Sequence, residues 1–200
     1  MRVFVTGGGG YIGTTLVPYL LSKGHSVSLL DRFFFGEQLL SGISGPLTLI
    51  RDDIRWFDGK ILQGHDAVVD LAALSNDPSG ELDPWKTIEI NYLGRSRVAR
   101  LAKEAGVPRY LLASSCSIYG FQEGTMTEDS KPNPLTTYAR ANVLAEKDNL
   151  ALSSAEFTPV ASRFATVYGL SRRMRFDLVV NGMVRGGLRT GWIPVMRDGS

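Results

Sequence analysis

Three glycines near the start of the chain have a spacing that suits phosphate binding. Gly7, Gly10 and Gly13 form the pattern G-x-x-G-x-x-G, after a short apolar run and before a helical pattern. The first glycine permits a tight turn, the second lets a pyrophosphate approach the backbone and the helix N-terminus, and the third lets the helix pack closely on a sheet. Tyr11 and Ile12 lie between the last two glycines. A generic strand-to-helix turn is the alternative, but the flanking patterns favour dinucleotide binding.

Acidic residues follow the next two apolar runs. Asp31 lies 18 residues beyond Gly13 and ends the second run. An acid at about this distance accepts hydrogen bonds from the adenosine ribose hydroxyls and repels the 2′-phosphate of NADP, whereas Arg32 next to it could hold that phosphate. We therefore expect NAD. Asp53 and Ile54 follow the third run and could hold the amino group and ring face of adenine, although adjacent acids in a loop are often only solvated.

The apolar patterns predict the elements that position these residues. Strands alternate with helices, which indicates an α/β fold with a parallel sheet covered on both faces. In such a sheet, ligands bind at the carboxyl ends of the strands, where each of these motifs falls. The expected strands are near residues 3–5, 26–30, 47–50, 67–71, 110–113 and 159–162, and helices are expected after the glycines and at 84–105, 137–152 and 173–188.

Composition excludes several classes of protein. The chain has 200 residues, 22 Lys and Arg, 20 Asp and Glu, and a net charge of +2, which is no electrostatic footprint for nucleic acid or an anionic membrane. The glycines interrupt the first apolar stretch, so neither a signal peptide nor a spanning helix is expected there. A single cysteine, Cys116, cannot form an internal disulfide and suggests a cytoplasmic location. No His, Cys and carboxylate set has metal-ligand spacing.

Further motifs complete a recognisable order along the chain. Leu71, Ala72 and Ala73, then Asn91, then residues 114–120 (Ser-Ser-Cys-Ser-Ile-Tyr-Gly), then Tyr138 follow the glycines and acids. The chain thus resembles the extended short-chain dehydrogenases/reductases, and within them the NAD-dependent nucleotide-sugar epimerase/dehydratase branch. The resemblance runs from residue 1 to about residue 170.

This resemblance implies a Rossmann-type, doubly wound parallel sheet. It implies an NAD-binding domain at 1–168 and the beginning of a small substrate-binding part at 169–200. It also implies a homodimer formed through the helices at 84–105 and 137–152, with no nucleic acid or membrane partner. Because family members are usually longer, we expect the chain to be incomplete, which the intact mass of the purified protein would test.

The resemblance also implies a mechanism. Tyr138 removes a proton from a sugar hydroxyl while the sugar carbon passes hydride to the nicotinamide, and Ser115 hydrogen-bonds the same oxygen. Four residues after the tyrosine, the family has a lysine that holds the nicotinamide ribose, whereas this chain has Asn142, which can hydrogen-bond a ribose but carries no charge. The residues expected to contact NAD are Gly7, Gly10, Tyr11, Ile12, Gly13, Asp31, Arg32, Asp53, Ile54, Leu71, Ala72, Ala73, Asn91, Ser114, Tyr138 and Asn142.

Other departures from the family bear on the reaction. Cys116 and Ser117 stand where dehydratases of the family have an Asp-Glu pair, and neither can protonate a leaving hydroxyl. We therefore expect oxidation of a nucleotide-activated sugar to a keto intermediate and re-reduction on the other face. The alternatives are a keto-sugar reductase or other dehydrogenase of the family, and a catalytically weak NAD-binding regulatory protein. Arg172, Arg173 and Arg175 could grip the diphosphate of the substrate or form a solvated basic loop.

Overall fold

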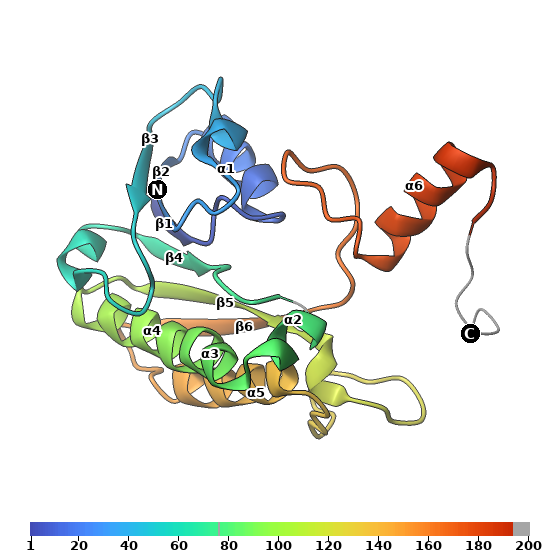
Figure 1. The fold of residues 1–200 in the computed structure, drawn as a ribbon. Helices are drawn as coiled ribbons and strands as arrows, with labels where there is room; N and C mark the ends of the chain where they lie inside the picture. The colour runs from blue at the N-terminus through green and yellow to red at the C-terminus, as the bar shows by residue number, and fades with distance from the viewer. Residues whose placement is uncertain (76, 194–200) are drawn as a thin grey trace.

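The computed structural model describes residues 1–75 and 77–193 of the chain. Its centre is a six-stranded parallel sheet with the strand order β3-β2-β1-β4-β5-β6 (Figure 1). This order reverses between β1 and β4, as in the Rossmann-type doubly wound fold, so the predicted fold class is confirmed. The strands are β1 (Arg2–Thr6), β2 (Ser26–Asp31), β3 (Leu47–Arg51), β4 (Ala67–Asp70), β5 (Arg109–Ser115) and β6 (Thr158–Phe164).

Two apolar cores lie on the opposite faces of this sheet. Because successive side chains of a strand point to opposite faces, Val3 and Val5 of β1 pack with Val17 of α1 (Gly13–Ser22), while Phe4 packs in the other core. That second core includes Val98 of α4 (Arg95–Glu104). Because helices cover both faces of the sheet, a ligand can reach it only at the ends of the strands, and the binding residues are expected there.

The helix expected at 84–105 is present but is not uniform. It begins as α3 (Pro84–Ile88), passes through a π-helical turn, η3 (Glu89–Gly94), and continues as α4. Asp83 caps its start by accepting a hydrogen bond from the backbone N–H of Lys86. It packs beside α5 (Thr137–Leu150), which corresponds to the helix predicted at 137–152, on one side of the sheet (Figure 1).

The last helix differs from its predicted start. We expected it to begin at Arg173, but α6 spans Val179–Thr190 and points away from the sheet (Figure 1). The residues before it, 169–178, form an irregular segment that we call the strap. Side chains outside the strap bond its backbone: Tyr11 and Asn181 bond Gly169, and Asn181 also donates to the carbonyl of Arg175.

Short elements connect the strands: η1 (Glu37–Leu40), η2 (Gly59–Leu62), α2 (Asp77–Leu82) and η4 (Cys116–Tyr119). His65, in the turn before β4, is buried, with its ring between Ser28 and the carbonyl of Leu62 and edge-on to Phe4. None of the helices in the described part of the chain is long and apolar enough to cross a membrane.

Candidate functional site

A cavity of about 960 Å³ opens at the carboxyl ends of the strands. The glycine loop, the ends of β2, β4, β5 and β6, the first turn of α5 and the strap line it. Of the residues predicted to be catalytic or to contact NAD, two do not line it: Asn91 and Asn142. Those that do are Gly7, Gly10, Tyr11, Ile12, Gly13, Asp31, Arg32, Asp53, Ile54, Leu71, Ala72, Ala73, Ser114, Ser115 and Tyr138.

The glycine loop is held against its neighbours in a way that only glycine permits. Gly7 has a φ of 67°, and a Cβ added there would lie 2.6 Å from the backbone nitrogen of Ala72. A Cβ on Gly13 would lie 2.4 Å from the Cα of Gly8. This compact turn brings the start of α1 to the cavity, where the first amides of a helix have no partner within the helix. The arrangement fits a pyrophosphate.

Asp31 joins the end of β2 to the glycine loop. One carboxylate oxygen accepts the N–H of Gly9 at 2.9 Å, and the other accepts the N–H of Phe33 at 2.7 Å. A carboxylate has about four acceptor positions, so each oxygen can still accept a second hydrogen bond. Asp31 can therefore hold the loop and accept ribose hydroxyls at the same time.

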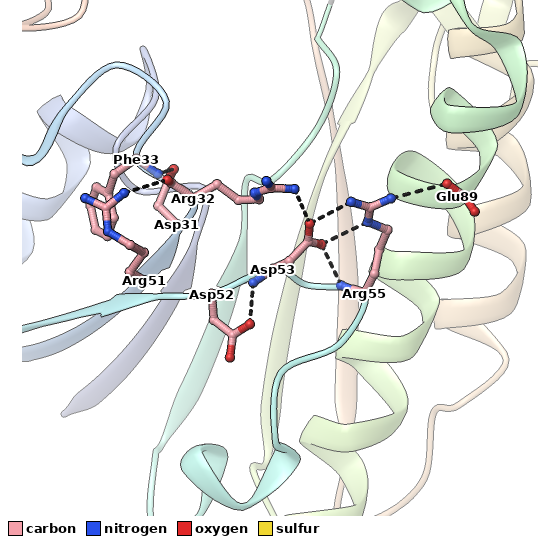
Figure 2. A network of polar contacts seen from close by, with 8 residues as sticks. All are labelled: Asp31, Arg32, Phe33, Arg51, Asp52, Asp53, Arg55 and Glu89. Carbon is pink, nitrogen blue, oxygen red and sulfur yellow. Dashed lines mark hydrogen bonds and ion pairs between the residues drawn. The ribbon is translucent and has the colours of Figure 1, made fainter.

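An ion-pair network lines the end of the cavity near Asp31 and Asp53, which we call the adenosine end because the sequence predicts adenosine there (Figure 2). Asp53 accepts hydrogen bonds from Arg32 at 2.9 Å and from Arg55 at 2.8 Å and 3.0 Å, and Arg55 also pairs with Glu89 at 3.2 Å. Burial acts to raise the pKa of Asp53, but hydrogen bonds from Arg55 and Arg32 outweigh it and lower the pKa to about 2.

This network changes what the predicted residues are free to do. With the N–H of Arg55 included, four donors already surround the carboxylate of Asp53, so an adenine amino group would have to displace one of them. Arg32 is held by Asp53 and is thereby directed away from an independent role in binding a phosphate. Arg55 and Glu89 were missed by sequence reasoning, because a basic and an acidic residue 34 positions apart give no local pattern.

The opposite end of the cavity contains Ser115 and Tyr138. The hydroxyl oxygen of Ser115 accepts the N–H of Ser117 at 3.1 Å, and because its O–H has no acceptor among the residues that the structure describes, it can donate into the cavity. Tyr138 lies in the first turn of α5, which Thr136 caps through the N–H of Ala139. Glu81 of α2 accepts the N–H of Thr137 at 2.7 Å and fastens this turn to α2.

Asn142 faces the interior rather than the cavity. It is 0% exposed, its Nδ2 donates to the carbonyl of Tyr138 at 3.0 Å, and its Oδ1 accepts Nη1 of Arg95 at 2.9 Å. Asn91 is also fully buried, and its amide bonds both the N–H and the carbonyl of Leu74. Their direct contact with a cofactor stays a prediction, and in this conformation each of them supports a neighbouring wall of the cavity.

The three arginines of the strap have separate partners. Arg172 donates to the carbonyls of Leu39 and Ser41, while Arg175 donates to Ser75 and pairs with Asp177. Arg173 lies 3.7 Å from the ring centroid of Phe35 and lines the cavity with Arg175. Burial lowers the pKa of Arg173 below its ordinary value. The two arginines that line the cavity are those in a position to meet a diphosphate.

The strap is also tied to the glycine loop. Tyr11 donates its hydroxyl to the carbonyl of Gly169 at 2.7 Å, and Ser171 donates to the carbonyl of Tyr11 at 2.7 Å. Asn181 of α6 donates to the hydroxyl of Tyr11 and accepts the N–H of Gly169. Together with the arginine contacts, these bonds connect the strap, which lines part of the cavity, to the glycine loop and to the loop after β4.

A further ion pair supports the end of β5. Arg163 of β6 pairs with Glu146 of α5 at 2.9 Å and donates to the hydroxyl of Tyr119 at 2.8 Å. The hydroxyl of Ser114 donates to the same carboxylate. The hydrogen bond to Glu146 raises the pKa of Arg163 above its ordinary value. Ser114 therefore lines the cavity while its side chain anchors α5.

The fold and the cavity define a Rossmann-type dinucleotide-binding domain. Comparison with known proteins makes this more specific: the model of the NAD-dependent epimerase/dehydratase family matches residues 3–199. The chain belongs to this family. The predicted membership of the extended short-chain dehydrogenases/reductases is thus confirmed, and so is NAD as the cofactor, because the family is NAD-dependent.

Three relatives illustrate the similarity. UDP-glucuronic acid decarboxylase 1 of Arabidopsis thaliana is 37% identical over 123 residues, which are 60% of this chain and 27% of the relative. An uncharacterized UDP-glucose epimerase, YtcB, of Bacillus subtilis is 27% identical over all of this chain and 66% of its own length. The structure of MoeE5 with UDP-glucose and NAD superimposes with a TM-score of 0.86, at 32% identity, over all of this chain and 65% of MoeE5. The chain thus spans about a quarter of the decarboxylase and two thirds of MoeE5.

Proposed function

We propose that this protein is an NAD-dependent enzyme that oxidises a nucleotide-activated sugar to a keto intermediate and reduces it again on the other face. The observation that carries this proposal is that Tyr138 and Ser115 line the same cavity as the glycine loop and Asp31. Relatives in the family act on UDP-glucose and UDP-glucuronic acid by their names, which supports the substrate class. NAD would be held by the glycine loop and Asp31, where it would accept and return a hydride.

The roles of the chain's own residues follow from their positions. Tyr138, in its ionised phenolate form, takes the proton of the sugar hydroxyl, and the resulting phenol returns it when the carbonyl is reduced. Ser115 donates its O–H to the same sugar oxygen, because the N–H of Ser117 already occupies an acceptor position of Ser115. Cys116 and Ser117 also line the cavity, and neither supplies the carboxylic acid that an elimination needs. This favours epimerisation over dehydration.

The strap favours a closed redox cycle over net reduction. It borders the cavity and is fastened to the glycine loop, to the loop after β2 and to the loop after β4. A cofactor beneath it would leave slowly, which suits re-reduction within one turnover. A keto-sugar reductase or dehydrogenase would have to exchange its cofactor each time. Retention of NAD during gel filtration, with no consumption of added NADH, is the expected result.

The direct test of the proposal is the nicotinamide absorbance. Adding nucleotide sugars to the NAD-loaded protein should reduce bound NAD with at least one of them. Thermal unfolding with a panel of nucleotides and nucleotide sugars first identifies the compounds to test as substrates, because ligands that bind only the folded state raise its stability. An absence of reduction with every binding nucleotide sugar contradicts the proposal.

The burial of Asn142 favours one candidate of another kind, an NAD-binding regulatory protein. No lysine occupies position 142, and the asparagine there does not line the cavity. Such a protein would bind NAD tightly and give no turnover. The same absorbance measurement separates the two candidates.

We propose further that the protein is a cytoplasmic homodimer. Leu93 of η3 and Leu144 of α5 are exposed, on two helical segments that pack together. A twofold contact would use this patch twice. Sedimentation should show a dimer, and a monomer at all concentrations would refute it. The cytoplasmic location rests on the lone cysteine, which cannot form an internal disulfide.

A further inference from the structure

A charged network is buried behind the wall that carries Ser115 and Tyr138. Asp70 ends β4, Arg95 begins α4, and both are 0% exposed, like Asn142. Nε of Arg95 lies 3.7 Å from Oδ2 of Asp70. The hydroxyls of Thr6 and Tyr110 donate to the two oxygens of Asp70. None of these polar groups has a role in the mechanism proposed above.

The guanidinium of Arg95 touches three elements of the site at once. Nη1 donates to Asn142, whose own Nδ2 donates to the carbonyl of Tyr138. Nη2 donates to the carbonyls of Ala113, at 2.5 Å, and of Asp70, at 3.3 Å. Ala113 precedes Ser114 and Ser115 on β5, and Asp70 precedes Leu71 at the end of β4. One side chain thus joins the strand ends to the first turns of the helix that carries Tyr138.

Stability alone does not account for such a network. Well-packed apolar residues often replace a buried ion pair without loss of stability, because two charges must be removed from water to form the pair. Here Nε of Arg95 also has no hydrogen-bond partner among the described residues, which adds to the cost. The guanidinium of Arg95 donates to Asn142 and to the carbonyls of Asp70 and Ala113, which lie next to residues that line the cavity. Because a guanidinium is planar and rigid, it fixes the relative positions of these acceptors, which the flexible ammonium of a lysine would not do.

We propose that Arg95 is a positioning residue for the reaction: through Ala113 and Asn142 it sets the distance and angle between Ser115 and Tyr138. The proposal rests on the function proposed above. Asn142 is then a link between Arg95 and α5, and its inward orientation is the working one.

The test is a single-turnover measurement of bound-NAD reduction with a saturating nucleotide sugar. The variant is Arg95→Met combined with Asp70→Asn, which removes both buried charges and leaves neither unpaired. We expect its rate constant to fall on the order of 10²-fold, as for small misplacements of reacting groups. The dissociation constants of NAD and of the nucleotide sugar should stay within about threefold of the wild type, because the network does not line the cavity.

The rate constant and the amplitude of NAD reduction distinguish a positioning role of Arg95 from a purely structural one. A purely structural role would lower the amplitude, which counts folded protein, and leave the rate constant of the folded fraction unchanged. Arg100→Met on the exposed side of α4 is the matched control and should leave both unchanged. If the double variant fails to fold, Asn142→Ala removes only the link from Arg95 to α5, and it should also slow the reaction about tenfold or more.

Each result decides the matter. A folded double variant, or a folded Asn142→Ala variant, that reduces NAD at the wild-type rate overturns the role of Arg95 and leaves the proposed function standing. If the wild-type protein fails to reduce bound NAD with every nucleotide sugar tested, the proposed function is refuted, and the role of Arg95 is refuted with it. Slow reduction at full amplitude with unchanged binding supports the proposal.

Discussion

The two ends of the cavity use charge in opposite ways. At the adenosine end, Asp53 is surrounded by Arg32 and Arg55, and the side chain of Arg32 is 48% exposed (Figure 2). At the Tyr138 end, Asp70 and Arg95 are fully buried and no side chain of that pair reaches the cavity. The network around Asp53 is open to solvent mainly through Arg32, which can move when a ligand binds, whereas the buried network fixes the wall that a ligand meets.

This difference has an energetic side. Ion pairs in contact with water contribute little to stability and weaken in salt. Removing one partner of a buried pair is costly, because it leaves a charge without compensation. Substitutions at the adenosine end should therefore alter binding and leave the fold intact. Substitutions at the Tyr138 end should alter rate or stability and leave the affinity for NAD nearly unchanged.

The largest effect is expected for Tyr138→Phe. Removing the general base should slow reduction of bound NAD by about 10²–10⁴-fold, while NAD binding remains nearly intact. Stopped-flow absorbance and fluorescence titration measure the two quantities. Tyr168→Phe, on an exposed tyrosine outside the lining of the cavity, is the control and should be as fast as the wild type. An active Tyr138→Phe variant would show that another group takes the proton.

The next effect concerns the missing lysine. Asn142→Lys would place an ammonium beside Nη1 of Arg95, and the second buried cation would have no partner. We expect it to lower the free energy of unfolding by about 3–5 kcal/mol, measured in urea. Adding Arg95→Met should recover much of that loss, because one cation again faces Asp70. A fully stable single variant would mean that the lysine turns into the cavity, where the family resemblance places it.

The contrast between the ends also explains what the sequence could predict. The strands, the glycine loop and the positions of Ser115 and Tyr138 were predictable, because each depends on local spacing within one strand-loop-helix unit. The inward direction of Asn142 was not, since it depends on Arg95, 47 positions away. The pattern i, i+4 places residues 138 and 142 on one helix face but does not say which neighbour takes the amide.

The late start of α6 has a similar cause. The residues around Arg173 have a helical composition, yet their polar groups bond to Tyr11, Ser41 and Ser75, which lie more than 90 positions away. Tertiary contacts of this kind override local propensity. The sequence signal that could have been noticed is the pair Tyr11 and Asn181, two polar residues beside the glycine loop and within the last helix.

At the adenosine end, Asp31→Ser should weaken NAD binding by about 1.5–3 kcal/mol, because a charged acceptor for the ribose hydroxyls is lost. The affinity for NADP should rise relative to that for NAD, but only modestly, because the ion pair with Asp53 keeps Arg32 from binding the 2′-phosphate. Combining Asp31→Ser with Asp53→Asn should release Arg32 and improve NADP further. Isothermal titration with both cofactors measures this, and a wild-type protein that prefers NADP would contradict our interpretation of Asp31.

The smallest effect is a dependence of stability on pH that belongs to Asp53. Its pKa in the folded protein is about 2, below the ordinary value of 3.8, so the carboxylate stabilises the fold above about pH 4 and loses this contribution as the pH falls toward 2. The shift corresponds to about 1–2 kcal/mol once the exposure of Arg32 is allowed for. Asp53→Asn should therefore be less stable than the wild type at pH 7 by this amount, and the difference should vanish near pH 2. Asp52→Asn is the matched control, because among the described residues the exposed Asp52 side chain accepts only the N–H of Asp53. If the free energies of unfolding of the wild type and Asp53→Asn differ by the same amount at pH 2.5 and pH 7, the charge of Asp53 does not stabilise the fold. Packing and neutral hydrogen bonds would then stabilise the network, and the contrast between the two ends of the cavity would be smaller than we infer.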